Sequence, residues 1–129
     1  MYINEMSEDL TMTDAYILES VKDYCQVPQE ADIYNSELCG HINTAFFTLF
    51  QLGCSARPFT VTDETATWED FTDNPYISSI VPEYVKRKVK LLFDPPANSF
   101  LVTQMKDELA EMESRISYAA DPGWEDIDD

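Results

Sequence analysis

The sequence has few of the residues on which most enzymes and nucleic-acid binders rely. Its 129 residues include one histidine, three glycines and eight Lys or Arg against 25 Asp or Glu, which gives a formal net charge of −17. The scarcity of cations excludes a protein that binds nucleic acid by neutralising phosphates, and it disfavours docking on an anionic membrane. The scarcity of glycine argues against a turn-rich sandwich or barrel.

Disulfides and membrane spans are also not expected. The cysteines are an odd number at wide spacing (Cys25, Cys39 and Cys54), which is no disulfide framework and favours a reducing compartment. The stretch Leu38–Ala56 contains no charged residue and is long enough to be considered as a membrane span. Polar residues interrupt it, so a buried amphipathic helix explains it better. The first residues lack the cationic and apolar regions of a secretory signal, so none is expected.

Apolar residues make up 44% of the chain, enough for one buried core, and recur mainly at helical spacing. Four main helices are predicted, each beginning beside residues that can cap it: Thr13 or Asp14, Asn35 or Ser36, Asn74 before Pro75, and Asn98 or Ser99. The first ends at Cys25, the second at Gly53, which suits a left-handed C-terminal cap, and the third at Phe93. The last carries its apolar face to Ile116.

Two of these helices have unusual features. The second helix has phenylalanines at 46, 47 and 50, which leave apolar surface on more than one side, so it is central to the bundle or faces another subunit. The third helix contains Pro82 about two turns in, so a kink or a restart is expected at Val81–Pro82.

Residues 55–74 are predicted to form a loop. Phe59–Thr62 is β-prone but too short to anchor a sheet, so at most one minor hairpin is expected. Thr67 and Asp70 resemble a capping box, which predicts one helical turn, and Trp68 and Phe71 are expected to pin the loop to the core. The predicted fold class is therefore all-α: a small four- to five-helix bundle with one long loop and an extended C-terminal tail. Its parts are an N-terminal extension (1–12), a helical domain (13–120) and an acidic tail (121–129).

The sequence offers little for chemistry. Zinc is usually bound by cysteine and histidine, and the chain offers Cys25, Cys39, His41 and Cys54. Their spacings match no usual paired-ligand pattern, so a metal-binding regulator is the least favoured of the functions considered. No nucleophile motif or phosphate loop is present, and paired acidic residues are explained by a solvated surface. We therefore expect no enzyme, no catalytic residue, no cofactor and no metal.

The cations are concentrated in one place. Lys86, Arg87, Lys88 and Lys90, here called the basic band, are half of all the Lys and Arg in the chain. A solvated helix face would explain them in an average protein. In so acidic a chain, such segregation suits self-association or docking to an acidic partner, so the band is a hypothetical partner-binding site.

The C-terminal tail is a second hypothetical partner-binding site. Trp124 and Ile127 are large apolar residues set among five carboxylates between Asp121 and Asp129. A disordered tail has no internal use for a tryptophan, whereas a segment that becomes ordered on binding does. The alternative is a tail that folds back over its own domain.

Four segments, taken in order, are similar to a known family: AYILESVKDYC at 15–25, HINTAFFTLFQLG at 41–53, TWEDF at 67–71 and YVKRKVKLLFDPPANSF at 84–100. Together they resemble the small helical head–tail connector (adaptor) proteins of tailed bacteriophages over about residues 13–118. The resemblance implies a structural protein of the virion neck, assembled in the host cytoplasm, with no enzymatic activity and no cofactor.

The resemblance also implies partners. It implies a homo-oligomeric ring, of about twelve-fold symmetry, beneath the portal protein and above a downstream neck or tail protein. DNA would pass through the lumen without specific binding, and the C-terminal segment would be the arm that reaches the portal. An acidic lumen suits DNA that must slide, and a closed ring needs two different complementary patches on each subunit. The main rival is an acidic protein that mimics DNA and inhibits a nucleic-acid-binding enzyme.

Overall fold

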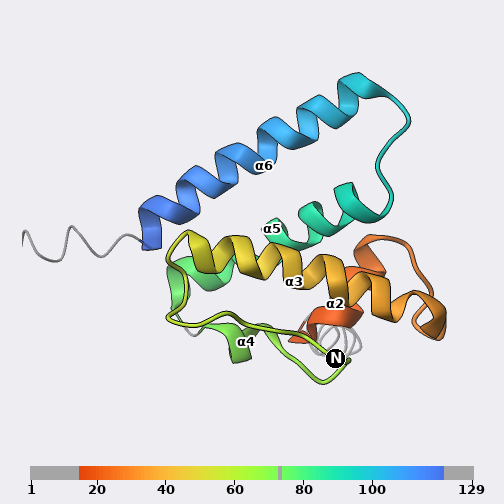
Figure 1. Ribbon diagram of the computed structural model, residues 1–129, viewed down its shortest axis with the longest axis horizontal. Helices are drawn as coiled ribbons and strands as arrows, with labels where there is room; N and C mark the ends of the chain where they lie inside the picture. The colour runs from red at the N-terminus through yellow and green to blue at the C-terminus, as the bar shows by residue number, and fades with distance from the viewer. Residues whose placement is uncertain (1–14, 73, 121–129) are drawn as a thin grey trace, which may run out of the picture.

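The computed structural model describes residues 15–72 and 74–120, and these form a helical bundle (Figure 1). In chain order the elements are α2 (Ile17–Tyr24), the 3-10 turn η1 (Asp32–Tyr34), α3 (Asn35–Gln51), α4 (Trp68–Phe71), α5 (Pro75–Phe93) and α6 (Ser99–Ala120). No strand occurs in the described ranges, so the predicted all-α class is confirmed. No helix among them is long and apolar enough to cross a membrane. The predicted extension 1–12 and tail 121–129 lie outside the described residues.

α3 and α5 pack against each other along the centre, α2 contacts both, and α6 packs on α5 (Figure 1). The C-terminal end of α6 lies close to the end of α3, where a Cβ added to Gly53 would stand 3.9 Å from the Cβ of Ala120. Toward its N-terminal end α6 diverges from the bundle (Figure 1). The buried residues of α6, Leu109 and Ile116, accordingly lie from its middle onward.

The core is formed by one stripe from each main helix. Its fully buried side chains include Ile17 and Val21 of α2, Leu38, Ile42, Phe46 and Leu49 of α3, and Val81, Tyr84, Val85 and Val89 of α5. The ring of Phe46 also contacts the long loop, with centroids 4.8 Å from Phe71, 4.9 Å from Phe59 and 6.2 Å from Trp68. The prediction that Trp68 and Phe71 pin this loop to the core is confirmed.

Three of the predicted helix ends are confirmed in atomic detail. At α4 the backbone N–H of Asp70 donates to Thr67 Oγ1 (3.3 Å), and the Thr67 N–H donates to Asp70 Oδ2 (2.8 Å), which is a complete capping box. At α6 the Asn98 Oδ1 accepts from the N–H groups of Phe100 and Leu101 (2.8 and 3.3 Å). After α3, Gly53 adopts a φ of +95°, the left-handed conformation that favours glycine.

The starts of α2 and α3 differ from the prediction. α2 begins at Ile17, not at residue 13, because the extended Tyr16 pairs with Thr67 and the Ile17 N–H donates to the Ala66 carbonyl at 3.0 Å. The proposed caps Thr13 and Asp14 lie outside the described residues. α3 follows directly from η1, and no side chain caps it. The Asn35 side chain bonds instead to Lys22.

Of the kink or restart expected at Val81–Pro82, the restart does not occur, and the long loop does not form the minor hairpin that the sequence allowed. α5 continues through Pro82 as one helix from Pro75 to Phe93, because residues on either side of the proline, among them Val81 and Tyr84, are held in the core. No hairpin forms within 55–72. The backbone of Val61 bonds to the side-chain amide of Asn43 instead of to a second strand.

Candidate interaction site: the basic band of α5

The basic band lies on the C-terminal half of α5 and is largely neutralised within the molecule. Lys86 Nζ lies 3.0 Å from Glu83 Oε2, and Lys90 Nζ lies 2.8 Å from Asp94 Oδ2, both along the same helix or its end. Lys88 makes no ion pair within residues 15–72 and 74–120, so it is the member of the band whose charge is uncompensated there. The band is therefore less cationic than its sequence suggests.

Arg87 links two helices. Its Nη1 donates to Glu108 Oε1 of α6 at 2.7 Å, and its Nη2 lies 3.6 Å from Glu83 Oε1 of α5. Its Nε is buried and has no hydrogen-bond partner among the described residues. Because two carboxylates already hold this guanidinium, Arg87 orients α6 against α5 as much as it presents charge to solvent.

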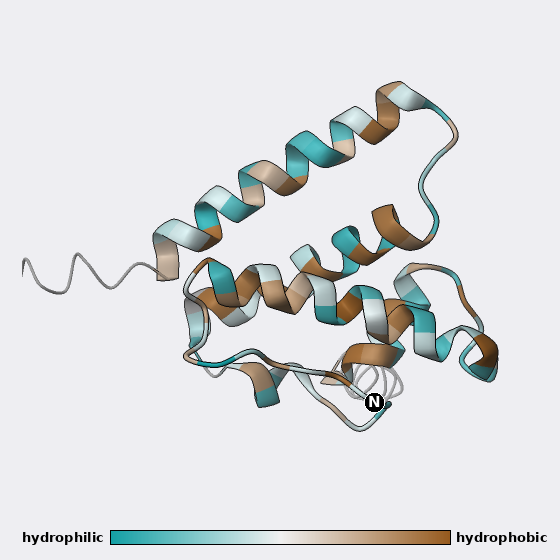
Figure 2. Ribbon diagram, viewed as in Figure 1, coloured by the Kyte–Doolittle hydropathy of each residue, from teal (hydrophilic) through white to brown (hydrophobic). Residues whose placement is uncertain are grey.

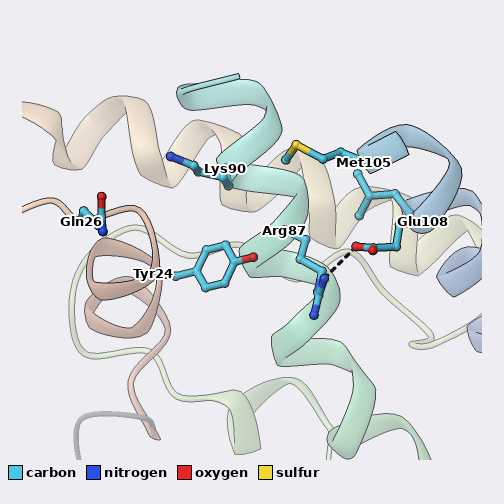
Figure 3. Close-up of a pocket in the computed structure, with 7 residues that line it drawn as sticks. Tyr24, Gln26, Arg87, Lys90, Met105 and Glu108 are labelled. Carbon is cyan, nitrogen blue, oxygen red and sulfur yellow. Dashed lines mark hydrogen bonds and ion pairs between the residues drawn. The ribbon is translucent and has the colours of Figure 1, made fainter. Parts of the chain in front are cut away.

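A groove of about 420 Å³ lies beside the band, between the end of α2, α5 and α6 (Figure 3). Its walls combine apolar side chains with a charged rim: Tyr24, Gln26, Arg87, Lys90, Met105, Glu108 and Leu109. Lys86 Nζ stands 5.7 Å from the centre of the Tyr24 ring, a cation–π distance. Such a surface suits a segment of another protein that carries both apolar and acidic side chains.

The cysteines and the histidine are not brought together. His41 Nε2 lies 3.3 Å from Glu37 Oε2 on the same helix, and the described residues contain no group of three or more His, Cys, Asp or Glu that could hold a metal. Burial raises the pKa of the Cys25 and Cys54 thiols to about 11 and also raises the pKa of Cys39. At neutral pH these thiols are protonated, which disfavours nucleophilic or metal-binding roles.

One protein family matches most of the chain. The model of a family described as phage connector protein matches residues 17–123, which extends from the first residue of α2 past the end of α6. The chain belongs to the phage connector protein family. No curated protein matches it. No solved structure matches it either.

Family membership confirms the head–tail connector resemblance carried by the four sequence segments. Connector proteins of this family have a structural role. Trp124 and Ile127, the tail residues predicted to bind a partner, lie outside the described residues, and so their placement in this connector stays a prediction.

One structurally important polar residue of the connector was missed by sequence reasoning. Lys22 is only 3% exposed, and its Nζ donates to the carbonyl oxygens of Gln29 (2.8 Å) and Ala31 (3.3 Å) and to Asn35 Oδ1 (2.8 Å). It holds the connection between α2 and α3 with three oxygen acceptors, none of them a carboxylate. The sequence signal was its position four residues after the buried Leu18, which places both on the same side of α2.

Proposed function

We propose that this protein is a head–tail connector subunit of the virion neck that forms a ring beneath the portal and extends the DNA channel, without enzymatic activity. The observation that carries the proposal is the family match, which spans the whole described bundle from Ile17 onward. The partners proposed from the family resemblance are copies of itself, the portal protein and a downstream neck or tail protein.

The charge of the chain supports the channel role. The net charge of −17 would repel the phosphates of DNA, so fixed carboxylates in a lumen would keep the polymer from adhering as it moves. The same charge is the one feature that favours the rival function, an acidic DNA mimic that blocks a nucleic-acid-binding enzyme. The two functions differ in assembly: a mimic acts as a monomer or dimer, whereas a connector forms large rings.

The test is size-exclusion chromatography with light scattering on the full chain, alone and mixed with portal rings. A connector is expected to elute as a ring, or to elute together with the portal when the portal is present. A protein that stays monomeric or dimeric under both conditions, and that inhibits a DNA-binding enzyme, would contradict the proposal and support the mimic.

We assign the two candidate partner sites within this function. The basic band and its neighbouring groove are proposed to contact an acidic surface of a neighbouring subunit or neck protein, with Lys88 as the available cation. The tail residues Trp124 and Ile127 are proposed to dock on the portal. Tryptophan is a frequent hot spot, and the surrounding carboxylates would select a basic surface and set orientation.

A further inference from the structure

The exposed apolar side chains of this acidic protein lie partly in two stretches that carry no charge. No Asp, Glu, Lys or Arg occurs from Leu38 to Ala56 or from Pro95 to Met105. The first stretch contains most of α3, and the second contains the beginning of α6. A large apolar side chain exposed on an uncharged surface is typical of a protein–protein interface.

The first uncharged surface is the outer face of α3. Gly40, Thr44, Phe47 and Gln51 are exposed and follow one another at intervals of four, three and four residues, so they lie on one stripe of the helix. Phe47 is 49% exposed, although Phe46 beside it is fully buried. A Cβ added to Gly40 would meet nothing within 4 Å, so no described part of the chain covers this end of the stripe.

The second uncharged surface is the beginning of α6, residues 99–105, here called the α6 tip. Phe100 is 69% exposed and Leu101 is 45% exposed. This part of the helix diverges from the bundle (Figure 1), and apolar residues are visible at its start (Figure 2). Phe100 is therefore presented largely to solvent, whereas Leu101 also lines a pocket with Lys90 and Asp94 at the end of α5.

We infer that the α6 tip of one copy packs on the outer face of α3 of the next copy, with Phe100 and Phe47 as the main apolar contacts. This inference rests on the proposed ring, because it names the two surfaces that join neighbouring subunits. Two copies of a chain with a net charge of −17 repel each other over most of their surfaces. The outer face of α3 and the α6 tip contribute no carboxylate of their own to such a contact, and two carboxylates beside the tip, Asp94 and Glu108, lie on the Leu101 side.

The shapes and positions of the faces support a head-to-tail contact. Gly40 and Thr44 are small, so a second helix could approach α3 closely beside the larger Phe47. The two faces lie on different helices of the same subunit, and each copy therefore carries one of each. Such a heterologous contact repeats from copy to copy and closes into a ring when the rotation allows it.

The experiment uses three full-length variants: Phe47→Asp, Phe100→Asp and, as a control, Tyr118→Asp. Tyr118 is 83% exposed but lies near the other end of α6 and outside both faces, so it tests for a general effect of added charge. Circular dichroism should show that all three fold, since each replaced side chain is substantially exposed. Phe47→Asp and Phe100→Asp are each expected to weaken self-association by about tenfold or more, while Tyr118→Asp assembles normally.

Mixing the two defective variants tests the direction of the contact. Phe47→Asp keeps an intact α6 tip, and Phe100→Asp keeps an intact α3 face, so an equimolar mixture should form a heterodimer but no ring, as measured by light scattering. The inference is overturned if both variants still form rings, if the mixture stays monomeric, or if the substitutions abolish only portal binding. Failure of the wild-type chain to assemble both alone and in the presence of portal rings would instead count against the proposed connector function.

Discussion

The side-chain amide of Asn43 and the backbone of Val61 form a closed pair of hydrogen bonds. Asn43 Nδ2 donates to the Val61 carbonyl at 3.0 Å, and the Val61 N–H donates to Asn43 Oδ1 at 2.7 Å. Val61 is almost fully buried, so its polar backbone groups need such partners. One amide on α3 therefore takes the place of a neighbouring strand and holds the long loop against the bundle.

Replacing Asn43 with Leu should lower the free energy of unfolding by about 1–3 kcal/mol, because the buried N–H and C=O of Val61 would lose their partners. Denaturant unfolding measures the loss, and faster hydrogen exchange at the Val61 amide locates it. The control is Ser114→Ala, at an exposed position of α6 outside both proposed subunit contacts, which should change stability by less than about 0.5 kcal/mol. Unchanged exchange at Val61 would show that the pair does not hold the loop.

Replacing Lys22 with Met should also destabilise the protein by about 1–3 kcal/mol, because three oxygen acceptors around its buried ammonium would be left unsatisfied. Lys106→Met, at an exposed lysine of α6, is the control and should have little effect. Thermal and denaturant unfolding compare the two variants. Equal stability of both would mean that Lys22 does not brace the connection between α2 and α3.

Stability should fall as pH rises above about 9. Burial is the main cause that raises the pKa of Cys25 from 9.0 to about 11. Between these values the unfolded thiol loses its proton while the folded thiol keeps it, so the folded state loses stability as pH increases. Unfolding measured at about pH 8 and pH 10 should show a smaller difference for Cys25→Ala than for the wild type. An identical pH dependence in the two proteins would contradict the prediction.

Charge reversal should separate the roles of the cations in the basic band. Lys88→Glu is expected to weaken assembly and to remove part of its salt dependence, because exposed charges are screened within about 8 Å at 0.15 M salt. The double variant Lys86→Glu/Lys90→Glu tests the locally paired members and leaves the Arg87–Glu108 contact intact. Arg57→Glu, an exposed cation outside the band, is the control. Normal assembly of both band variants, measured by light scattering, would exclude the band from the interface.

Removing the tail should abolish binding to portal rings without unfolding the bundle. A chain that ends at Ala120 and the full-length variant Trp124→Ala should both keep their helical circular dichroism spectrum. Binding should weaken by about 2 kcal/mol or more for Trp124→Ala, as expected for a hot-spot tryptophan. Asp129→Asn, which removes one charge, should change binding only slightly. Unchanged affinity of the truncated chain for the portal would make the tail no more than a solubilising end.

Local rules were enough to predict most helices from the sequence. The capping box at Thr67 and Asp70, the Asn98 cap and the left-handed Gly53 were predicted because each depends on side chains within a few residues of a helix end. The burial of Leu49 and Phe46 followed from helical periodicity. The family was also recognisable at this level, since its resemblance is a pattern of helices and connections along the chain.

Contacts between residues far apart in the sequence decided the features of the fold and of the candidate site that local rules did not predict. The start of α2 depends on the pairing of Tyr16 with Thr67, and the absence of a hairpin depends on Asn43 reaching Val61. From the sequence, the basic band was predicted to be an exposed positive surface. In the structure, Arg87 of the band forms an ion pair with Glu108 of α6. Sequence periodicity reports which side of a helix is apolar. Only the packing of helices decides which polar groups meet, because hydrogen bonds and ion pairs require atoms within a few ångströms.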